Sequence, residues 1–264
     1  TSLTPTHVYT TAGTYSVTVI TTSANGNGSA TRDIVISEVP TATQPTSILI
    51  CDDNNDGFYN FDLTTQKLAI LNGQSESQFN VRFFANATDY ANNVVLANAT
   101  IFQNTTAYQP QTIIAEVFNV TNPICKTTTT FTIQVYESPM PSTSILPIQL
   151  CDNISFGTDI DGKVVFNLTS SQTQILNGQS PSNFTVFYYK DVALTDLISN
   201  PSSYVNTNIL ETIFVKVVNN LNANCFTSTS FQIEVLNLPT ITSTISLKQC
   251  DDNNDGFSAF NLTE

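Results

Sequence analysis

The chain has 264 residues, with 8 Lys or Arg against 21 Asp or Glu, so its formal net charge is −13. It is 41% hydrophobic but only 11% charged, a composition typical of β-rich extracellular proteins rather than helical cytosolic enzymes. The acidic surface excludes nucleic acid and anionic membranes as partners, because no basic cluster could displace counterions. No apolar run approaches the length of a membrane helix.

A repeat of about 100 residues organises the chain. The motif ILNGQS occurs at 70–75 and again at 175–180, and two cysteines follow the same register in each copy. Prolines mark the boundaries, since proline cannot continue a central strand. They stand at Pro40, Pro139 and Pro239. The predicted units are 1–39, the C-terminal part of an immunoglobulin-like domain; 40–139, the first repeat; 140–239, the second repeat; and 240–264, the start of a truncated third copy.

Short runs rich in Val, Ile, Phe and Tyr predict the strands of each repeat. We expect them at 47–51, 79–84, 112–120 and 131–136 in the first repeat, and at 184–189, 212–218 and 231–236 in the second. One short helix is predicted in each, starting at Thr64 or Thr65, or at Thr169 or Ser170, and ending at Asn72-Gly73 or Asn177-Gly178. The fold class is therefore all-β: tandem immunoglobulin-like antiparallel β-sandwiches.

The cysteines predict disulfides. Each complete repeat holds two of them with the same separation of 74 residues, which favours the bonds Cys51–Cys125 and Cys151–Cys225. Cys250 would stay unpaired because the third copy is truncated. The alternatives are a thiol nucleophile or a metal ligand. The only histidine lies in another unit, at His7, and the CxxC spacing of zinc sites is absent.

An acidic motif follows the first cysteine of each copy. CDDNNDGF occurs at 51–58 and again at 250–257. Asp52, Asn54 and Asp56 with Gly57 fit the first half of the pattern D-x-[DN]-x-[DN]-G, in which side-chain oxygens and a later carbonyl, here that of Phe58, converge on Ca²⁺. Position 12 is Leu63 rather than Glu, so this is no EF-hand; Asp62 could close the shell instead.

The other copies test this interpretation. The second repeat places five extra residues before its Asp-Gly pair yet keeps oxygen side chains. The candidate ligands there are Asp152, Asp159 and Asp161, and in the third copy they are Asp251, Asn253 and Asp255. A plain turn has no need to keep these oxygens, which favours calcium as a cofactor. The competing interpretation is a polar turn, because Asp, Asn and Gly are common in turns.

Catalysis is not expected. These carboxylates crowd one short loop instead of facing each other across a cleft, and one histidine cannot supply a Ser/His/Asp set. The nine glycines form no phosphate-binding loop.

Two resemblances arise from these residues. His7-Val8-Tyr9 with Gly13-Thr-Tyr15-Ser-Val-Thr-Val is similar to the closing half of a PKD domain, an immunoglobulin-like sandwich of bacterial surface proteins and secreted hydrolases. Residues 41–264, with CDDNNDGFYNFDLT, ILNGQS and FTIQV, resemble repeats of giant flavobacterial surface proteins. That family implies export by type IX secretion, in many members a gliding-motility-associated sorting domain, and an extracellular or cell-surface location with adhesion or filament roles.

We therefore expect a structural stalk or filament segment of a secreted bacterial adhesin, stiffened by disulfides within each repeat and by calcium. Its partners would be further repeats of the same chain and a surface or glycan ligand at a tip outside this segment. The sequence does not decide whether the repeats self-associate into fibres. The alternative is a carbohydrate- or ligand-binding module of a secreted hydrolase, which the absence of Trp disfavours.

Overall fold

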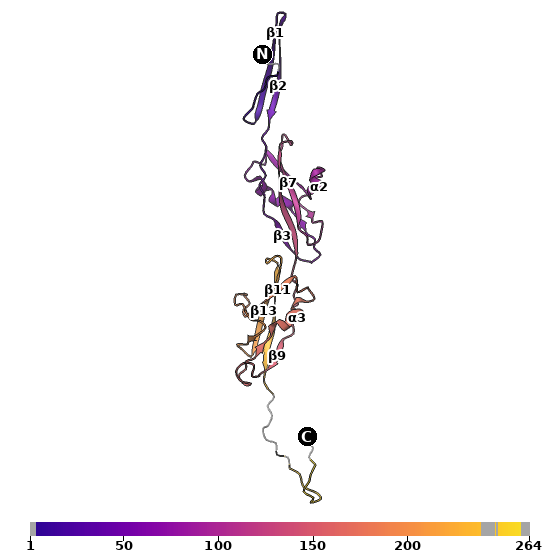
Figure 1. The fold of residues 1–264 in the computed structure, drawn as a ribbon, viewed down its shortest axis with the longest axis vertical. Helices are drawn as coiled ribbons and strands as arrows, with labels where there is room; N and C mark the ends of the chain where they lie inside the picture. The colour runs from indigo at the N-terminus through magenta and orange to yellow at the C-terminus, as the bar shows by residue number, and fades with distance from the viewer. Residues whose placement is uncertain (1–3, 239–245, 247, 260–264) are drawn as a thin grey trace. The chain divides into compact units, whose positions relative to one another are not determined.

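The computed structural model describes residues 4–238, 246 and 248–259 (Figure 1). Pro239 and the residues 240–245, 247 and 260–264 of the expected third copy lie outside the described residues. The chain forms two compact units. The first comprises residues 1–140, 179–185 and 217–227, and the second comprises residues 141–178, 186–216 and 228–264.

The chain begins with a two-stranded antiparallel hairpin of β1 (Gly13–Ser23) and β2 (Gly26–Ile36). Its register pairs Tyr15 with Ile34 and Val19 with Ala30, so these side chains share one face. Gly26 closes the two-residue turn with a φ of 132°, a conformation that L side chains rarely adopt.

The first repeat builds a four-stranded sheet in the order β3-β8-β7-β5, and β4 pairs separately with β6. β7 is antiparallel to β5 and to β8, whereas β3 lies parallel to β8, so the sheet is mixed rather than wholly antiparallel. The elements are β3 (Ile48–Asp52), β4 (Asn60–Phe61), η1 (Leu63–Gln66), α1 (Lys67–Leu71), β5 (Phe79–Phe84), α2 (Ala87–Ala91), β6 (Phe102–Gln103), β7 (Gln111–Asn119) and β8 (Lys126–Glu137).

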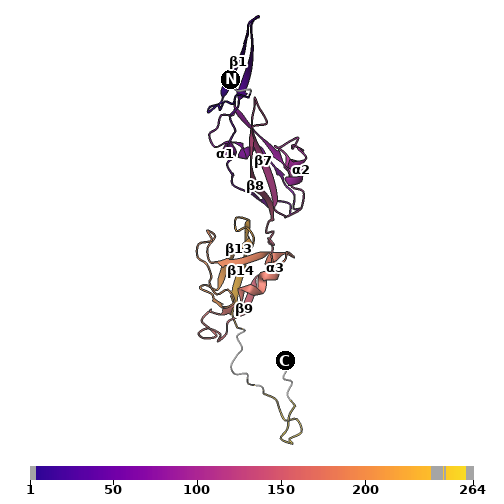
Figure 2. The same cartoon turned by 45° about the horizontal axis from the view of Figure 1, so that its top comes forward.

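One face of this sheet forms the hydrophobic core. Alternate residues of β5, β7 and β8 point toward β4, η1 and α1 and are almost fully buried. The core comprises Phe61, Leu63, Ile70, Leu71, Phe79, Phe83, Ile113, Ala115, Val117, Phe131, Ile133 and Val135. Figure 2 shows α1 and α2 on opposite sides of β7 and β8, and Tyr90 of α2 packs edge-to-face on Phe84.

The second repeat follows the same plan, with a sheet in the order β11-β13-β14-β9, a separate β10-β12 pair, and β9 parallel to β14. Its elements are β9 (Ile148–Cys151), β10 (Val165–Phe166), η2 (Leu168–Ser171), α3 (Gln172–Leu176), β11 (Phe184–Tyr189), β12 (Tyr204–Val205), β13 (Leu210–Asn219) and β14 (Phe226–Leu236). The predicted class, all-β tandem immunoglobulin-like sandwiches with short helices, is confirmed.

Local turn chemistry explains the helices, although one detail of the prediction is wrong. Both helices stop at a left-handed Asn, Asn72 with a φ of 46° and Asn177 with a φ of 49°. The helical segment starts one or more residues before the predicted threonines or serine, because a 3₁₀ turn precedes each helix. Its side-chain cap is Asp62, or Asn167 in the second repeat, which accepts a hydrogen bond from the second following N–H.

Tyr188→Phe tests a buried hydroxyl in the second core. Tyr188 occupies the place of Phe83, with an edge-to-face contact to Phe231 that matches Phe83 on Phe131. Its hydroxyl is buried without a hydrogen-bond partner, and burial raises the pKa of Tyr188 to about 12. A folded-state pKa above the unfolded value of about 10 means that stability is complete below pH 10 and declines as the pH rises toward 12.

We expect Tyr188→Phe to keep or raise the free energy of unfolding at pH 7, by up to about 1 kcal/mol, and to reduce its loss between pH 9 and 12, measured by urea unfolding at each pH. Tyr204→Phe is the matched control, since it deletes the hydrogen bond from that hydroxyl to Glu211, 2.8 Å long, and should destabilise at pH 7. A marked destabilisation by Tyr188→Phe at pH 7 would contradict the assignment of a partnerless hydroxyl.

Candidate functional site: the disulfide and the acidic loops

A disulfide joins Cys51 to Cys225, at a sequence separation of 174. The Cα atoms are 5.4 Å apart, within the range that a disulfide requires. Cys51 stands near the end of β3, and Cys225 directly precedes β14. Both belong to the first compact unit, which includes residues 217–227.

The predicted bonds within each repeat are therefore wrong. Cys125 and Cys151 are free thiols, Cys125 half-buried and Cys151 exposed. The reason lies in the strand register, which pairs Cys51 with Tyr136 near the end of β8, whereas Cys125 directly precedes the start of β8. At roughly 3.3 Å per residue the length of β8 separates the two cysteines by about 35 Å. Cys250, expected to be unpaired, is a free exposed thiol.

Hydrogen bonds hold the loop that carries Cys225 against the chain after β8. Asn219 donates from its side chain to the carbonyl of Glu137 at 2.8 Å, and the Thr227 hydroxyl donates to the carbonyl of Pro139 at 2.8 Å. The side chain of Asn183 donates to the Glu137 carboxylate at 3.0 Å. The bridge is thus supported by polar contacts that fix the same loop.

The same contacts recur one repeat earlier, where they hold a free thiol. Asn119 donates to the carbonyl of Glu38 at 3.1 Å, and Thr127 donates to that of Pro40 at 2.7 Å. Cys125 then lies with its Sγ 3.8 Å from the carbonyl oxygen of Ser37. Residues 1–50 contain no cysteine that could do for Cys125 what Cys51 does for Cys225.

The first acidic loop is folded around the buried carboxylate of Asp52. Its Oδ2 accepts the N–H of Gly57 at 2.6 Å, and its Oδ1 accepts that of Asn54 at 3.2 Å. Burial, followed by the negative charges of Asp52 and Glu137, raises the pKa of the nearby Tyr108 to about 12. Donors from the protein therefore satisfy this carboxylate.

The other oxygens of this loop also bond locally. Asp56 accepts the N–H of Phe58 at 2.7 Å and the side-chain amide of Asn54 at 2.8 Å. Asp62 caps η1 by accepting the N–H of Thr64 at 2.9 Å, and its role in closing a cation shell stays a prediction. Capping also explains why the neutral Asn167 can replace it in the second repeat.

A buried asparagine, which the sequence analysis did not single out, ties each loop to the next turn. Asn104 donates to the carbonyl of Gly57 at 2.8 Å and accepts the N–H of Tyr59 at 2.8 Å. Asn206 repeats both bonds with Gly162 and Val164. The shared Asn-Thr at 104–105 and 206–207 was the available signal, because each pair stands a few residues before the long strand of its repeat.

The second loop forms the same Asp-to-Gly hydrogen bond although it has five extra residues. Asp152 Oδ2 accepts the N–H of Gly162 at 2.7 Å, as Asp52 does for Gly57. Asp161 accepts the N–H groups of Thr158 and Lys163, both at 2.9 Å. In the third copy, Asp251 accepts the N–H of Gly256 at 2.7 Å, and Asp255 and Asn253 repeat the bonds of Asp56 and Asn54. The Asp-to-Gly clamp is thus common to all three copies.

Among the described residues, no group of three or more Asp, Glu, His or Cys side chains is already arranged to hold a metal ion. The predicted ligands of each copy do lie together in one loop, Asp62 excepted. Calcium at these loops remains a prediction.

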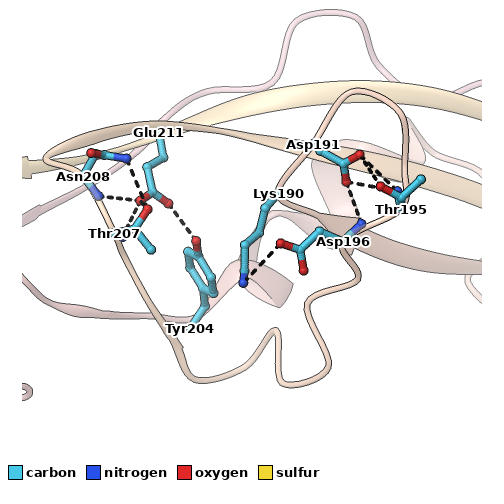
Figure 3. A network of polar contacts seen from close by, with 8 residues as sticks. All are labelled: Lys190, Asp191, Thr195, Asp196, Tyr204, Thr207, Asn208 and Glu211. Atoms are coloured by element: carbon cyan, nitrogen blue, oxygen red, sulfur yellow. Dashed lines mark hydrogen bonds and ion pairs between the residues drawn. The ribbon is translucent and has the colours of Figure 1, made fainter.

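A second polar network, also absent from the sequence predictions, surrounds Glu211 and Asp191 (Figure 3). Glu211 accepts hydrogen bonds from the N–H of Asn208 and from the Tyr204 hydroxyl, and Asp191 accepts the N–H of Asp196 at 2.7 Å. That bond, with those from Thr195, lowers the pKa of Asp191. Both carboxylates fix loops and face their own donors, which is a structural rather than a catalytic arrangement.

These features define a class of protein: tandem β-sandwich domains in which a disulfide links one domain to the next. The chain belongs to the family described as the Flavobacterium inter-domain disulphide bond domain, which matches residues 47–139 and 147–239. The prediction of a flavobacterial repeat protein is confirmed to that extent. No helix of the described residues is long and apolar enough to cross a membrane.

Other comparisons add little. No curated protein matches the chain. Among solved structures, an endo-fucoidan hydrolase of glycoside hydrolase family 107 is 11% identical, with a TM-score of 0.19 over 87% of this chain and 35% of its own. Mouse protocadherin-24 EC1-3 is 12% identical, with a TM-score of 0.22 over 84% and 80%. The human desmocollin-1 ectodomain is 13% identical, with a TM-score of 0.23 over 92% and 51%. The chain thus spans about a third of the hydrolase.

A tryptic map of the non-reduced protein checks the disulfide directly. Cleavage after Lys and Arg places Cys51 and Cys225 in different peptides, 33–67 and 217–248, and Cys125 and Cys151 in two others. We expect mass spectrometry to find 33–67 bonded to 217–248, because only these cysteines lie within bonding distance. A bond between the peptides of Cys51 and Cys125 would contradict the register described above.

Gly57→Ala tests the close packing of the first loop. A Cβ on Gly57 would lie 2.4 Å from Cβ and 2.9 Å from Cα of Ala107, and its φ is 82°. We expect a loss of more than about 2 kcal/mol in the free energy of unfolding, from strain and overpacking together. Gly73→Ala is the matched control, with a φ of 86° and no atom within 4 Å, and should cost only about 1 kcal/mol. Equal losses in the two variants would show that the contact with Ala107 is not limiting.

Proposed function

We propose that this chain is a load-bearing stalk segment of a secreted bacterial surface protein. The observation that carries the proposal is the Cys51–Cys225 bond, which starts in one family domain and ends in the next. A bond of that kind ties consecutive domains together covalently instead of stabilising each domain alone. The bridge between domains therefore replaces the expected disulfides within each repeat as the feature that stiffens the stalk.

The bond changes the path that a pulling force takes through the chain. Force applied to the two ends passes through Cys51 and Cys225, so the segment 52–224 between them is shielded even if it unfolds. Closing a loop of this length also removes entropy from the unfolded chain, worth about 5 kcal/mol in the chain-entropy model. Both effects suit a segment that projects an adhesive end under tension.

The position of Cys151 predicts a second disulfide of the same kind, to a further domain. Cys151 pairs in register with Leu236 on a parallel strand, as Cys51 pairs with Tyr136, and its thiol is exposed. We expect it to bond to the later cysteine of a following domain. Disulfides persist in oxidising compartments, which supports a location outside the cell. Export by type IX secretion, attachment to the cell surface, and a glycan or surface ligand elsewhere in the protein form part of the proposal.

Calcium is the proposed cofactor of this stalk. In each copy, a short loop that carries Asp side chains directly follows a cysteine, which is Cys51, Cys151 or Cys250. The whole chain has a net charge of −13. A cation there would offset the repulsion and stiffen the end of the strand that carries the cysteine.

Pulling single molecules by their ends tests the proposed load-bearing role. In the oxidised protein we expect residues 52–224 to contribute no extension at any force below bond rupture. Reduction should release an additional length of about 60 nm, from 174 residues at about 3.5 Å each. A double variant, Cys51→Ser with Cys225→Ser, should show the long extension without reductant. Full extension of the oxidised wild type would overturn the proposal.

A further inference from the structure

Beside the second acidic loop lies a hollow of about 480 Å³ lined by three carboxylates. Asp152, Asp159 and Asp161 line it, together with Asn237, and no basic residue contributes to the lining. The nearest lysine in sequence, Lys163, holds its ammonium 5.8 Å from the ring centroid of Phe156. The hollow therefore concentrates negative charge without a cation from the protein.

Asp152 is the unusual member of this set. Its side chain is among the buried polar groups, with 6% exposure, and Oδ2 is occupied by the N–H of Gly162 at 2.7 Å. Its Oδ1 is buried and has no hydrogen-bond partner. A buried carboxylate oxygen that has lost its water without gaining a donor carries a desolvation cost. A ligand that supplies positive charge at Oδ1 would remove this cost.

In the first loop the corresponding oxygen, Asp52 Oδ1, is not vacant, because it accepts the N–H of Asn54 at 3.2 Å. Tyr108 is also near Asp52: burial, and then the charge of Asp52, raises the pKa of Tyr108. Tyr108 lies between Asn104 and Gln111, and the corresponding segment from Asn206 to Glu211 is two residues shorter. It contains no tyrosine, and Ile209 stands beside Gly162 where Ala107 stands beside Gly57.

The third copy supports the same reasoning. Its loop sequence is identical to the first, and Gly256 donates to Asp251 Oδ2 at 2.7 Å, yet Asp251 Oδ1 is buried without a hydrogen-bond partner. A central aspartate with an unbonded Oδ1 thus occurs with the loop sequence of the second copy and also with the sequence that the first and third copies share. What distinguishes the first loop is the hydrogen bond from the Asn54 N–H to Asp52 Oδ1, whereas Oδ1 of Asp152 and of Asp251 has no partner.

We propose that the second acidic loop, and not the first, is a Ca²⁺ site of this protein, with Asp152 Oδ1 as its central ligand and Asp159 and Asp161 completing the charge. The first loop matches the calcium pattern best by sequence, but its central carboxylate is already satisfied. Ca²⁺ suits this hollow because it accepts six to eight oxygen ligands in flexible geometry, including carbonyls and water. Each Asp161 oxygen keeps a second lone pair beyond the hydrogen bond that it accepts.

This inference rests on the proposed cation stiffening and not on the load-bearing role of the disulfide. It also differs from a general attraction of cations to an acidic surface, because it assigns different behaviour to two loops with the same number of carboxylates. Asp52, Asp53 and Asp56 line the hollow beside the first loop, again with no basic residue. Matched variants in the two loops therefore separate the specific site from the general charge.

The test is a calorimetric titration of the oxidised 264-residue chain with CaCl₂, from micromolar to about 5 mM, a range that covers typical extracellular calcium modules. All proteins carry Asp251→Asn, so that the third copy does not contribute. We expect Asp152→Asn to weaken binding at least tenfold and to abolish the rise in melting temperature that Ca²⁺ produces. Asp52→Asn should leave both unchanged.

Asp159→Asn provides a second variant in case Asp152→Asn does not fold, since no hydrogen bond to the Asp159 side chain is present among the described contacts. It should also weaken binding while keeping the melting temperature without calcium. Loss of binding in Asp52→Asn with retention in Asp152→Asn and Asp159→Asn would overturn the assignment, as would absence of binding up to 5 mM. Equal affinity for MgCl₂ would overturn the choice of Ca²⁺. Pulling experiments in EDTA would still report on the disulfide, so the two proposals can fail separately.

Discussion

The parallel pairing of the first strand of a repeat with its last strand is the constraint on which the rest of the structure depends. It places Cys51 beside Tyr136, at the end of β8 where the chain leaves the domain. The other cysteine of the repeat directly precedes the start of the same strand. A disulfide therefore cannot close within the repeat, and each cysteine is available only to a neighbouring domain.

The acidic loop follows directly from that strand end. Because Asp52 and Asp152 come one residue after the cysteine, each is buried at the exit of the sheet and clamps a glycine N–H across the loop. The buried Asn104 or Asn206 then ties the glycine carbonyl to the turn before the long strand. Cysteine, carboxylate and asparagine form one connected structure at the end of the domain from which the chain continues. A cation bound at the second loop would act on β9, the strand that carries Cys151.

The first sheet also contains a buried acidic side chain, which two basic side chains hold in place. Glu116 on β7 is fully buried between Arg82, 2.5 Å away, and Lys126, 2.7 Å away. The guanidinium of Arg82 lies over the ring of Phe118, so the charged group is covered by an aromatic side chain. Two of the eight basic residues thus serve one glutamate. The scarcity of cations elsewhere makes the uncompensated carboxylates of the acidic loops more conspicuous.

The sequence by itself determined the repeat, the strands, the short helices and their Asn stops, and hence the all-β sandwich class. These depend on local periodicity and turn chemistry, which a single chain displays directly. It could not decide which cysteines bond, because equal spacing in the two repeats is compatible with closure inside a repeat or across repeats. Nor could it show that Asp62 caps a helical turn, or that both oxygens of Asp52 accept hydrogen bonds while Asp152 Oδ1 has no donor. Only the tertiary structure decided these points, since strand register and the reach of a distant side chain set which atoms meet.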